Sequence, residues 1–226
     1  MEEVERRRPS RVGRYSAIAG DLYGITFDVE TNAAWADFIH LTQIMDAALD
    51  DTPGWLNEQE SEELLKKYID PQFLEAEFPS LAPSHNPEHY DRLKTMAQRL
   101  MRLNRYIKQT SSHERYVSLK QLEGRCYAQM ILACCSQDIM AQANYQKFAN
   151  DFIKLGEAGI LFDTLIDNSR DFRRGETQVK LSLQERFRLI GRSAIIMKGV
   201  YPKLIRPKPL VILLATSVKV ALDRTK

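Results

Sequence analysis

The stretch LFDTLIDNSRDFRRGET, residues 161–177, places three aspartates at steps of four in an otherwise apolar helical pattern. Side chains at i and i+4 lie on one face of an α-helix, so Asp163, Asp167 and Asp171 share a face over about two turns. Like charges at this spacing cost roughly 0.2 to 0.5 kcal/mol per pair even on an exposed helix. A bound cation would remove that cost, while a solvated helix face is the ordinary alternative.

The same helical face continues backwards into small and aromatic residues. It carries Gly159, Gly156, Phe152 and Ala149 on successive turns. The face therefore passes from carboxylates into an apolar wall.

A second acidic cluster lies upstream in IHLTQIMDAALDD, residues 39–51, where Asp46 and Asp50 are one turn apart. The face shared with Asp46 again forms a largely apolar wall. Two such helices facing each other would enclose an apolar cavity with carboxylates at its mouth. Oxygen ligands without clustered His or Cys favour a hard cation, and Mg²⁺ usually combines one or two carboxylates with phosphate oxygens. The pattern predicts Mg²⁺ and a phosphorylated substrate. The wall residues are Thr42, Ile39, Phe38 and Trp35.

The rest of the chain favours a single all-helical domain. A chain of 226 residues can bury one sizeable core, glycines number only 10, and alternating β patterns are scarce. We assign residues 1–31 to a basic N-terminal segment and residues 32–226 to the helical domain. Apolar periodicity and Pro or Gly breaks predict helices over residues 32–49, 58–68, 87–108, 113–141, 143–172, 183–199 and 207–223.

Several features predict a cytoplasmic protein. The apolar run 210–218 is too short to span a membrane, and the N-terminus lacks the apolar core of a secretory signal. Cys126, Cys134 and Cys135 suit buried reduced thiols. Residues 170–208 hold 11 Lys and Arg against 3 Asp and Glu. This basic region could contact phosphate, an anionic membrane surface or nucleic acid, or be an ordinary solvated surface.

The two acidic motifs resemble those of the class I isoprenoid synthases, nearest the squalene and phytoene synthase branch and its related terpene cyclases. The first motif of that family reads DDxxD or DxxxD, and DAALD at residues 46–50 is similar to the second form, with Ala47 where many members have Asp. The second motif there is Asn or Asp followed by two Asp at steps of four, often trailed by a basic pair and Gly. Residues 163–175 resemble it, and the likeness covers about residues 33–220.

The resemblance implies a single helical bundle of the class I terpenoid synthase type with a central apolar cavity. It also implies carboxylates that bind Mg²⁺ and a prenyl diphosphate substrate. The implied catalytic metal ligands are Asp46, Asp50, Asp163, Asp167 and Asp171. The expected diphosphate-binding residues are Arg125, Tyr127, Arg170 and Arg174, and the expected pocket residues are Trp35, Phe38, Ile39, Thr42, Phe152, Gly156 and Gly159.

We therefore expect a Mg²⁺-dependent terpene synthase that ionises an allylic prenyl diphosphate and cyclises or rearranges the carbocation. Two alternatives stay open: a head-to-head prenyl transferase like the squalene and phytoene synthases, and a non-catalytic helical partner subunit that retains the fold. Only residues 172–226 follow the second motif, so completion of the bundle by a partner, including a homodimer, also stays open, as does peripheral membrane contact. Nucleic-acid binding is not expected, because no recognised binding motif accompanies the basic region.

Overall fold

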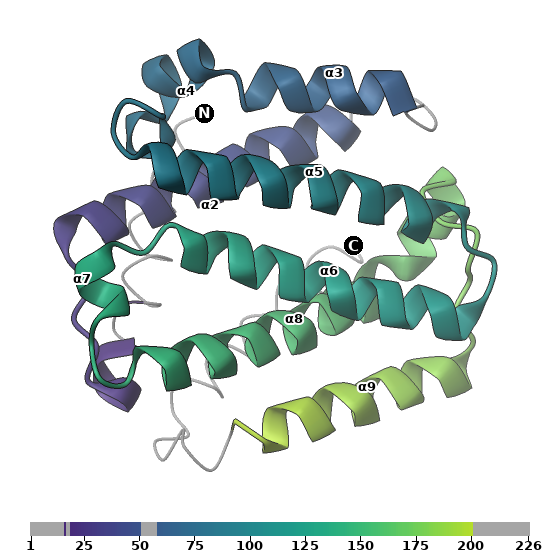
Figure 1. The fold of residues 1–226 in the computed structure, drawn as a ribbon. Helices are drawn as coiled ribbons and strands as arrows, with labels where there is room; N and C mark the ends of the chain where they lie inside the picture. The colour runs from purple at the N-terminus through teal and green to yellow at the C-terminus, as the bar shows by residue number, and fades with distance from the viewer. Residues whose placement is uncertain (1–15, 17–18, 51–57, 201–226) are drawn as a thin grey trace, which may run out of the picture.

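The computed structural model describes residue 16, residues 19–50 and residues 58–200 (Figure 1). In that part of the chain every regular element is helical, which confirms the all-α class. The expected helix at 207–223 and most of the N-terminal segment lie outside the described residues. Besides a short helical stretch at residues 19–23, the elements are α2 Val29–Asp50, α3 Glu58–Tyr68, α4 Pro71–Glu77, η1 Pro79–Leu81, α5 Pro87–Gln109, α6 His113–Ala133, α7 Gln137–Met140, α8 Tyr145–Arg174 and α9 Leu183–Lys198.

The sequence-based prediction of one helix over 113–141 is wrong, because α6 ends at Ala133 and the short α7 follows. Ser136 caps α7, since its hydroxyl accepts a hydrogen bond from the backbone N–H of Ile139 at 3.3 Å. Its own N–H donates to Thr31 Oγ1 at 3.0 Å, and its hydroxyl also bonds Asp28. A capping serine starts a new helix more readily than it continues an old one.

The region between α3 and α5 is also more ordered than a Pro-rich break suggests. Asp70 caps α4 by accepting hydrogen bonds from the N–H groups of Gln72 and Phe73 at 2.9 and 3.1 Å. Asn86 caps α5 by accepting from the His89 N–H at 3.1 Å, with Pro87 at the first helical position. Proline is favoured at the first helical position because the N–H group that it lacks would have no hydrogen-bond partner within the helix there.

Helix α8 is the centre of the described bundle. It packs against α6 on one side and α9 on another, and α5 packs against α6 (Figure 1). The closest backbone approach joins α6 and α8 at two glycines. A Cβ added to Gly124 would lie 2.3 Å from the Gly156 carbonyl oxygen, and one added to Gly156 would lie 2.6 Å from the Gly124 carbonyl oxygen. Only glycine on both sides permits this crossing.

Aromatic rings fill the core where α2 meets the first half of α8. The Trp35 ring lies 4.8 Å from Phe27 and 5.3 Å from Phe152, measured between centroids. Phe148 lies 5.6 Å from Phe152, and Tyr23 packs on Phe148 at 5.5 Å. Offset and edge-on ring pairs of this kind stabilise a core beyond their buried area. This cluster joins the start of the described chain to α8.

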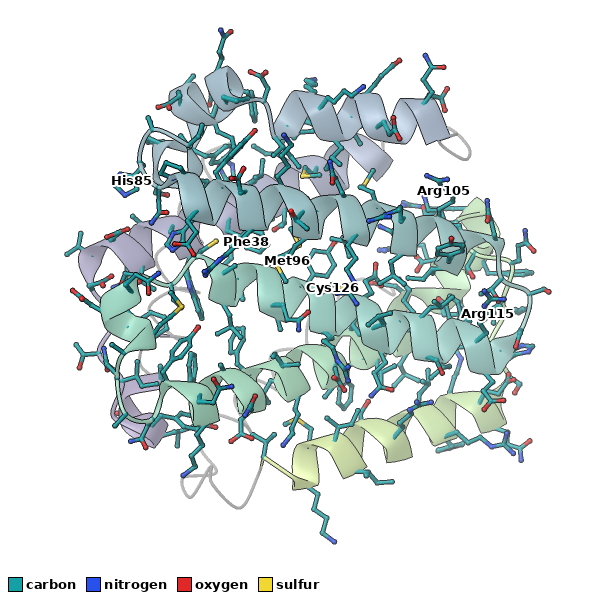
Figure 2. All side chains as sticks on the ribbon, in the orientation of Figure 1. Phe38, His85, Met96, Arg105, Arg115 and Cys126 are labelled. Carbon is teal, nitrogen blue, oxygen red and sulfur yellow. The ribbon has the colours of Figure 1, made fainter. Side chains whose placement is uncertain are left out.

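The side chains of Phe38, Met96 and Cys126 point into the bundle, while His85, Arg105 and Arg115 lie at its edges (Figure 2). All cysteines of the chain are buried and free, in agreement with the sequence-based prediction. Burial raises the pKa of the Cys135 thiol to about 12, although hydrogen bonds with Trp35 and Tyr145 oppose the rise. No helix among the described residues is long and apolar enough to cross a membrane.

Candidate functional site

The second half of α8 carries the three aspartates of the acidic stripe, Asp163, Asp167 and Asp171. Asp163 is exposed, whereas the Asp167 and Asp171 side chains are only 23% and 18% exposed. One guanidinium forms ion pairs with the two less exposed, or inner, carboxylates. Arg170 Nη1 lies 3.4 Å from Asp167 Oδ1, and Arg170 Nε lies 3.5 Å from Asp171 Oδ1. A cationic group therefore already lies beside both inner carboxylates.

Arg170 also presents an unsatisfied donor. Its Nε is buried and makes no hydrogen bond with any described residue, since the contact with Asp171 is a charge interaction without hydrogen-bond geometry. A buried donor without an acceptor costs free energy, and such groups are uncommon in folded proteins. This unpaired N–H lies beside the acidic stripe, while the Arg170 side chain as a whole is 40% exposed.

The surroundings of the Asp171 carboxyl shift its pKa. Burial raises its pKa to about 6, and the negative charges of Glu176 and Asp167 act in the same direction. The positive charges of Arg170 and Lys120 oppose the rise. Asp171 therefore gains a proton near pH 6, and its ionised form at neutral pH lacks sufficient positive charge around it.

Lys120 on α6 is a candidate residue that the sequence analysis missed. Its Nζ lies 2.8 Å from Glu123 Oε2, and its charge also interacts with Asp171. Burial lowers the pKa of Lys120, but Glu123, Tyr116 and Asp171 together outweigh burial, so the net pKa is raised. Lys120 is thus a permanent cation near the end of the stripe. The sequence holds no signal for it, because only the packing of α6 on α8 brings it there.

The face of α8 that holds the stripe also holds Phe152, which contacts α2 through Trp35. Asp163 follows Phe152 by eleven residues, and Asp46 follows Trp35 by eleven residues. Each interval is about 16 Å of helix, and α2 and α8 run in the same general direction from left to right (Figure 1). The backbone of α2 reaches Asp50, while the Asp46 and Asp50 side chains lie outside the described residues.

The residues expected to line an apolar pocket lie in several environments. Phe38 is buried, Ile39 and Phe152 are partly buried against the core, and Thr42 donates its hydroxyl to the Ile39 carbonyl at 2.9 Å. Trp35 is fully buried. The core contains Trp35 and Phe38, with Ile39 and Phe152 packed against it, and a central cavity stays a prediction.

The two glycines expected in the pocket differ. Gly156 has a packing role at the crossing with Gly124, whereas nothing lies within 4 Å of the place where a Cβ on Gly159 would stand. Gly159 is exposed on the same face as Asp163. Only Gly159 is therefore open to an incoming molecule.

The expected diphosphate-binding residues are also spread out. Arg170 lies within the stripe, and Arg174 pairs with Glu176 at 3.6 Å near its end. Tyr127 is partly buried against the core. Arg125 instead pairs with the buried Glu157 at 2.7 Å, away from the stripe. Arg170 and Arg174 therefore lie near the aspartates of the stripe, whereas Arg125 does not.

The glycine and the loop after the stripe have structural roles. Gly175 ends α8 in the left-handed conformation with φ of 75°, and the Glu176 N–H donates to the Asp171 carbonyl at 2.8 Å. The buried Asn168 then holds the following loop, because its amide donates to the Val179 carbonyl and accepts from the Leu181 N–H, both at 2.9 Å. This local order fixes the C-terminal end of the stripe.

The donor chemistry of the stripe fits a hard divalent cation, although a complete ligand set is not assembled there. Among the described residues no group of three His, Cys, Asp or Glu is close enough to hold a metal ion. The stripe steps along the helix, and the guanidinium of Arg170 supplies positive charge beside the inner pair. Two carboxylates close enough to contact one cationic group could also contact one Mg²⁺ ion. Mg²⁺ is usually bound by one or two carboxylates, and phosphate oxygens of the substrate complete its coordination shell.

Comparison of the chain with protein-family models, with curated proteins and with solved structures finds no match. The function is therefore inferred from the residues of the site.

Proposed function

We propose that the chain is a Mg²⁺-dependent class I terpene synthase acting on an allylic prenyl diphosphate. The observation that supports the proposal is the Trp35–Phe152 contact between α2 and α8, which each acidic motif follows in its own helix. The first aspartate of each motif follows the Trp35–Phe152 contact by eleven residues, and Asp163 lies about 20° from Phe152 around the axis of α8. Carboxylates from two helices at one level are a known way to build metal sites in helical bundles.

Asp163, Asp167 and Asp171 would hold Mg²⁺ together with Asp46 and Asp50 of α2. When bound, Mg²⁺ neutralises the negative charge that develops on the departing diphosphate. The exposed part of the Arg170 guanidinium donates to a diphosphate oxygen, and the charges of Lys120 and Arg174 draw the same group toward the stripe. Phosphate oxygens suit a guanidinium fork.

The reaction breaks the allylic carbon–oxygen bond of the substrate. The electron pair leaves with the diphosphate oxygen, and the carbon chain is left as an allylic cation. Apolar side chains exclude the water that would quench this cation, and the ring of Phe152 can stabilise a nearby positive charge by about 0.5 to 2 kcal/mol. Cyclisation or rearrangement then follows from the shape of the enclosure, and loss of a proton gives a hydrocarbon.

Incubation with geranyl, farnesyl and geranylgeranyl diphosphates tests the proposal. We expect Mg²⁺-dependent release of pyrophosphate and a hydrocarbon or alcohol detectable by mass spectrometry. Asp167→Asn should abolish turnover without loss of folding, whereas Asp91→Asn, the same change at an exposed site on α5, should leave turnover unchanged. Absence of pyrophosphate release from every substrate would contradict the proposal, and a C30 or C40 product would identify head-to-head condensation instead.

The ion pairs of Arg170 favour one second candidate, a non-catalytic helical subunit. They place a positive charge beside Asp167 and Asp171 without any metal, so the fold does not require one. In that case wild-type protein and Asp167→Asn would both lack turnover and would show equal thermal stability with and without Mg²⁺. A metal-dependent rise in melting temperature limited to the wild type would exclude this candidate.

A further inference from the structure

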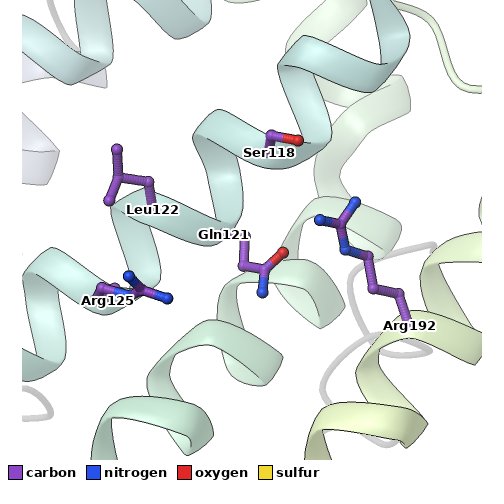
Figure 3. Close-up of a pocket in the computed structure, with 5 residues that line it drawn as sticks. All are labelled: Ser118, Gln121, Leu122, Arg125 and Arg192. Atoms are coloured by element: carbon purple, nitrogen blue, oxygen red, sulfur yellow. The ribbon is translucent and has the colours of Figure 1, made fainter.

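A pocket of about 330 Å³ lies between α6 and α9 (Figure 3). Its lining residues are Ser118, Gln121, Leu122, Arg125 and Arg192. Glu157 of α8, which both Arg125 and Gln121 contact, is six residues before Asp163 and so points about 120° away from it around the helix axis, and it lies about 15 and 21 Å of helix before Asp167 and Asp171. The pocket is therefore a different location from the acidic face.

The buried Glu157 organises the α6 side of this pocket. Arg125 Nε donates to Glu157 Oε1 at 2.7 Å, and Gln121 Nε2 donates to Glu157 Oε2 at 2.8 Å. Arg125 Nη2 also lies 2.7 Å from Oε1. Both carboxylate oxygens are thus engaged on the protein side, while the Arg125 side chain stays half exposed. Glu157 fixes the position of the guanidinium, and Arg125 also lines the pocket.

Arg192 supplies the opposite wall from α9. It has no ion-pair or hydrogen-bond partner among the described residues, and Gln121 lies between it and Arg125 (Figure 3). The two guanidinium charges and the one carboxylate of Glu157 leave the pocket with a net charge of +1. With the Ser118 hydroxyl, the lining offers hydrogen-bond donors from two helices around one space.

We propose that this pocket binds a phosphate group. A tetrahedral oxyanion accepts hydrogen bonds in several directions, and arginine forks pair with it through two parallel N–H groups. Arg125 binds it from α6 and Arg192 from α9, while Glu157 and Gln121 position Arg125. Ile195, one turn from Arg192 and 75% exposed, provides an apolar neighbour, so the phosphate can be free or the headgroup of a lipid.

Calorimetric titration of the full chain with inorganic phosphate tests the site directly. The titration contains EDTA and constant ionic strength, so that carboxylate-bound metal contributes nothing. We expect saturable binding that Arg192→Gln weakens at least tenfold. Arg188→Gln, which removes an exposed arginine one turn earlier on α9, should change affinity less than twofold, and Asp167→Asn should leave it unchanged. Because the site is independent of the acidic stripe, this result does not depend on turnover of any prenyl substrate.

Sedimentation with phosphatidylcholine vesicles, with and without phosphatidic acid, distinguishes the two sources of phosphate. Arg192-dependent binding to the phosphatidic acid vesicles assigns the site to a lipid headgroup. Binding of free phosphate without vesicle binding assigns it to a soluble phosphate. The proposal is overturned if neither probe binds saturably, or if Arg188→Gln lowers affinity as much as Arg192→Gln, because diffuse positive charge would then explain the attraction.

Discussion

Asp171 lowers the stability of the folded protein at neutral pH. Its pKa is raised from 3.8 to about 6, so the folded protein binds a proton more tightly than the unfolded chain. The resulting stability is present below about pH 4 and is lost as the pH rises through 6. At neutral pH the ionised side chain is held at a cost that a cation would reduce.

Replacement of Asp171 by Asn should therefore stabilise the metal-free protein at pH 7.5 by about 2 kcal/mol and have little effect at pH 4. Urea denaturation without Mg²⁺ at the two pH values measures the change in the free energy of unfolding. Asp91→Asn on α5 serves as the matched control and should be neutral at both. Equal effects of Asp171→Asn at pH 4 and pH 7.5 would contradict the assigned cause.

At this scale the sequence predicted that Asp163, Asp167 and Asp171 lie on one helix, because an interval of four residues is a local property of a helix, while their role as metal ligands stays a prediction. It could not predict the roles of Lys120 and Gly156. Lys120 comes near the stripe only when α6 packs on α8. The packing role of Gly156 depends on the close approach of Gly124, and nothing in the local sequence indicates that approach. Residue roles that depend on two helices at once carry no local signature.

At the scale of helices, the crossing of α6 and α8 depends on the absence of side chains. Gly156→Ala should destabilise the protein by about 1 to 3 kcal/mol or more, since the new methyl group would overlap the backbone of α6. Gly159→Ala, less than one turn away in open space, should be neutral or stabilising by up to about 1 kcal/mol. Thermal and urea unfolding measure both. Similar losses at the two sites would mean that the close approach is absent.

The loop between α8 and α9 depends on Asn168. Asn168→Ala removes a buried side chain that satisfies the Val179 carbonyl and the Leu181 N–H, so we expect a loss of about 2 to 3 kcal/mol in the free energy of unfolding. Asn150→Ala, an exposed change on the same helix, should cost much less. Hydrogen exchange provides a second measurement, because the Leu181 amide should lose protection in Asn168→Ala alone.

The helices themselves were predicted with uneven success, and the reason is where their ends are fixed. The centre of α8 follows from its apolar periodicity. The end of α6 does not, because Ser136 stops it through contacts with Asp28 and Thr31, more than a hundred residues away in the chain. Caps made by neighbouring residues are visible in sequence, and caps secured by distant ones are not.

Across the whole molecule, the buried cysteines report on global opening. Cys126, Cys134 and Cys135 are each at most 2% exposed, and burial raises the pKa of each thiol. A thiol reagent at pH 8 should therefore react with the native protein only as fast as the bundle unfolds. The absorbance change of the thiol reagent at low denaturant concentration measures the rate at which the cysteines react. Rapid reaction of one thiol in native buffer would show local opening around that cysteine.

The all-helical class followed from scarce glycine and helical periodicity, which are properties of the chain as a whole. The arrangement of the helices did not, because periodicity tells which face is apolar without telling which partner covers it. The contact of Trp35 with Phe152, which joins α2 to α8, is one that the sequence pattern could not predict. The type of bundle and its central cavity remain predictions for the substrate experiments.

The glycine crossing also has a mechanical consequence. Gly156 lies about 10 Å of helix before Asp163 and about 22 Å before Asp171, and its backbone contact with α6 leaves no slack for sliding. The crossing thus acts as a fulcrum near the middle of α8. A small tilt of α8 about this crossing moves the Asp171 carboxylate roughly twice as far as the Asp163 carboxylate. The positions of the two ends of the stripe can therefore change while the packed core stays in place.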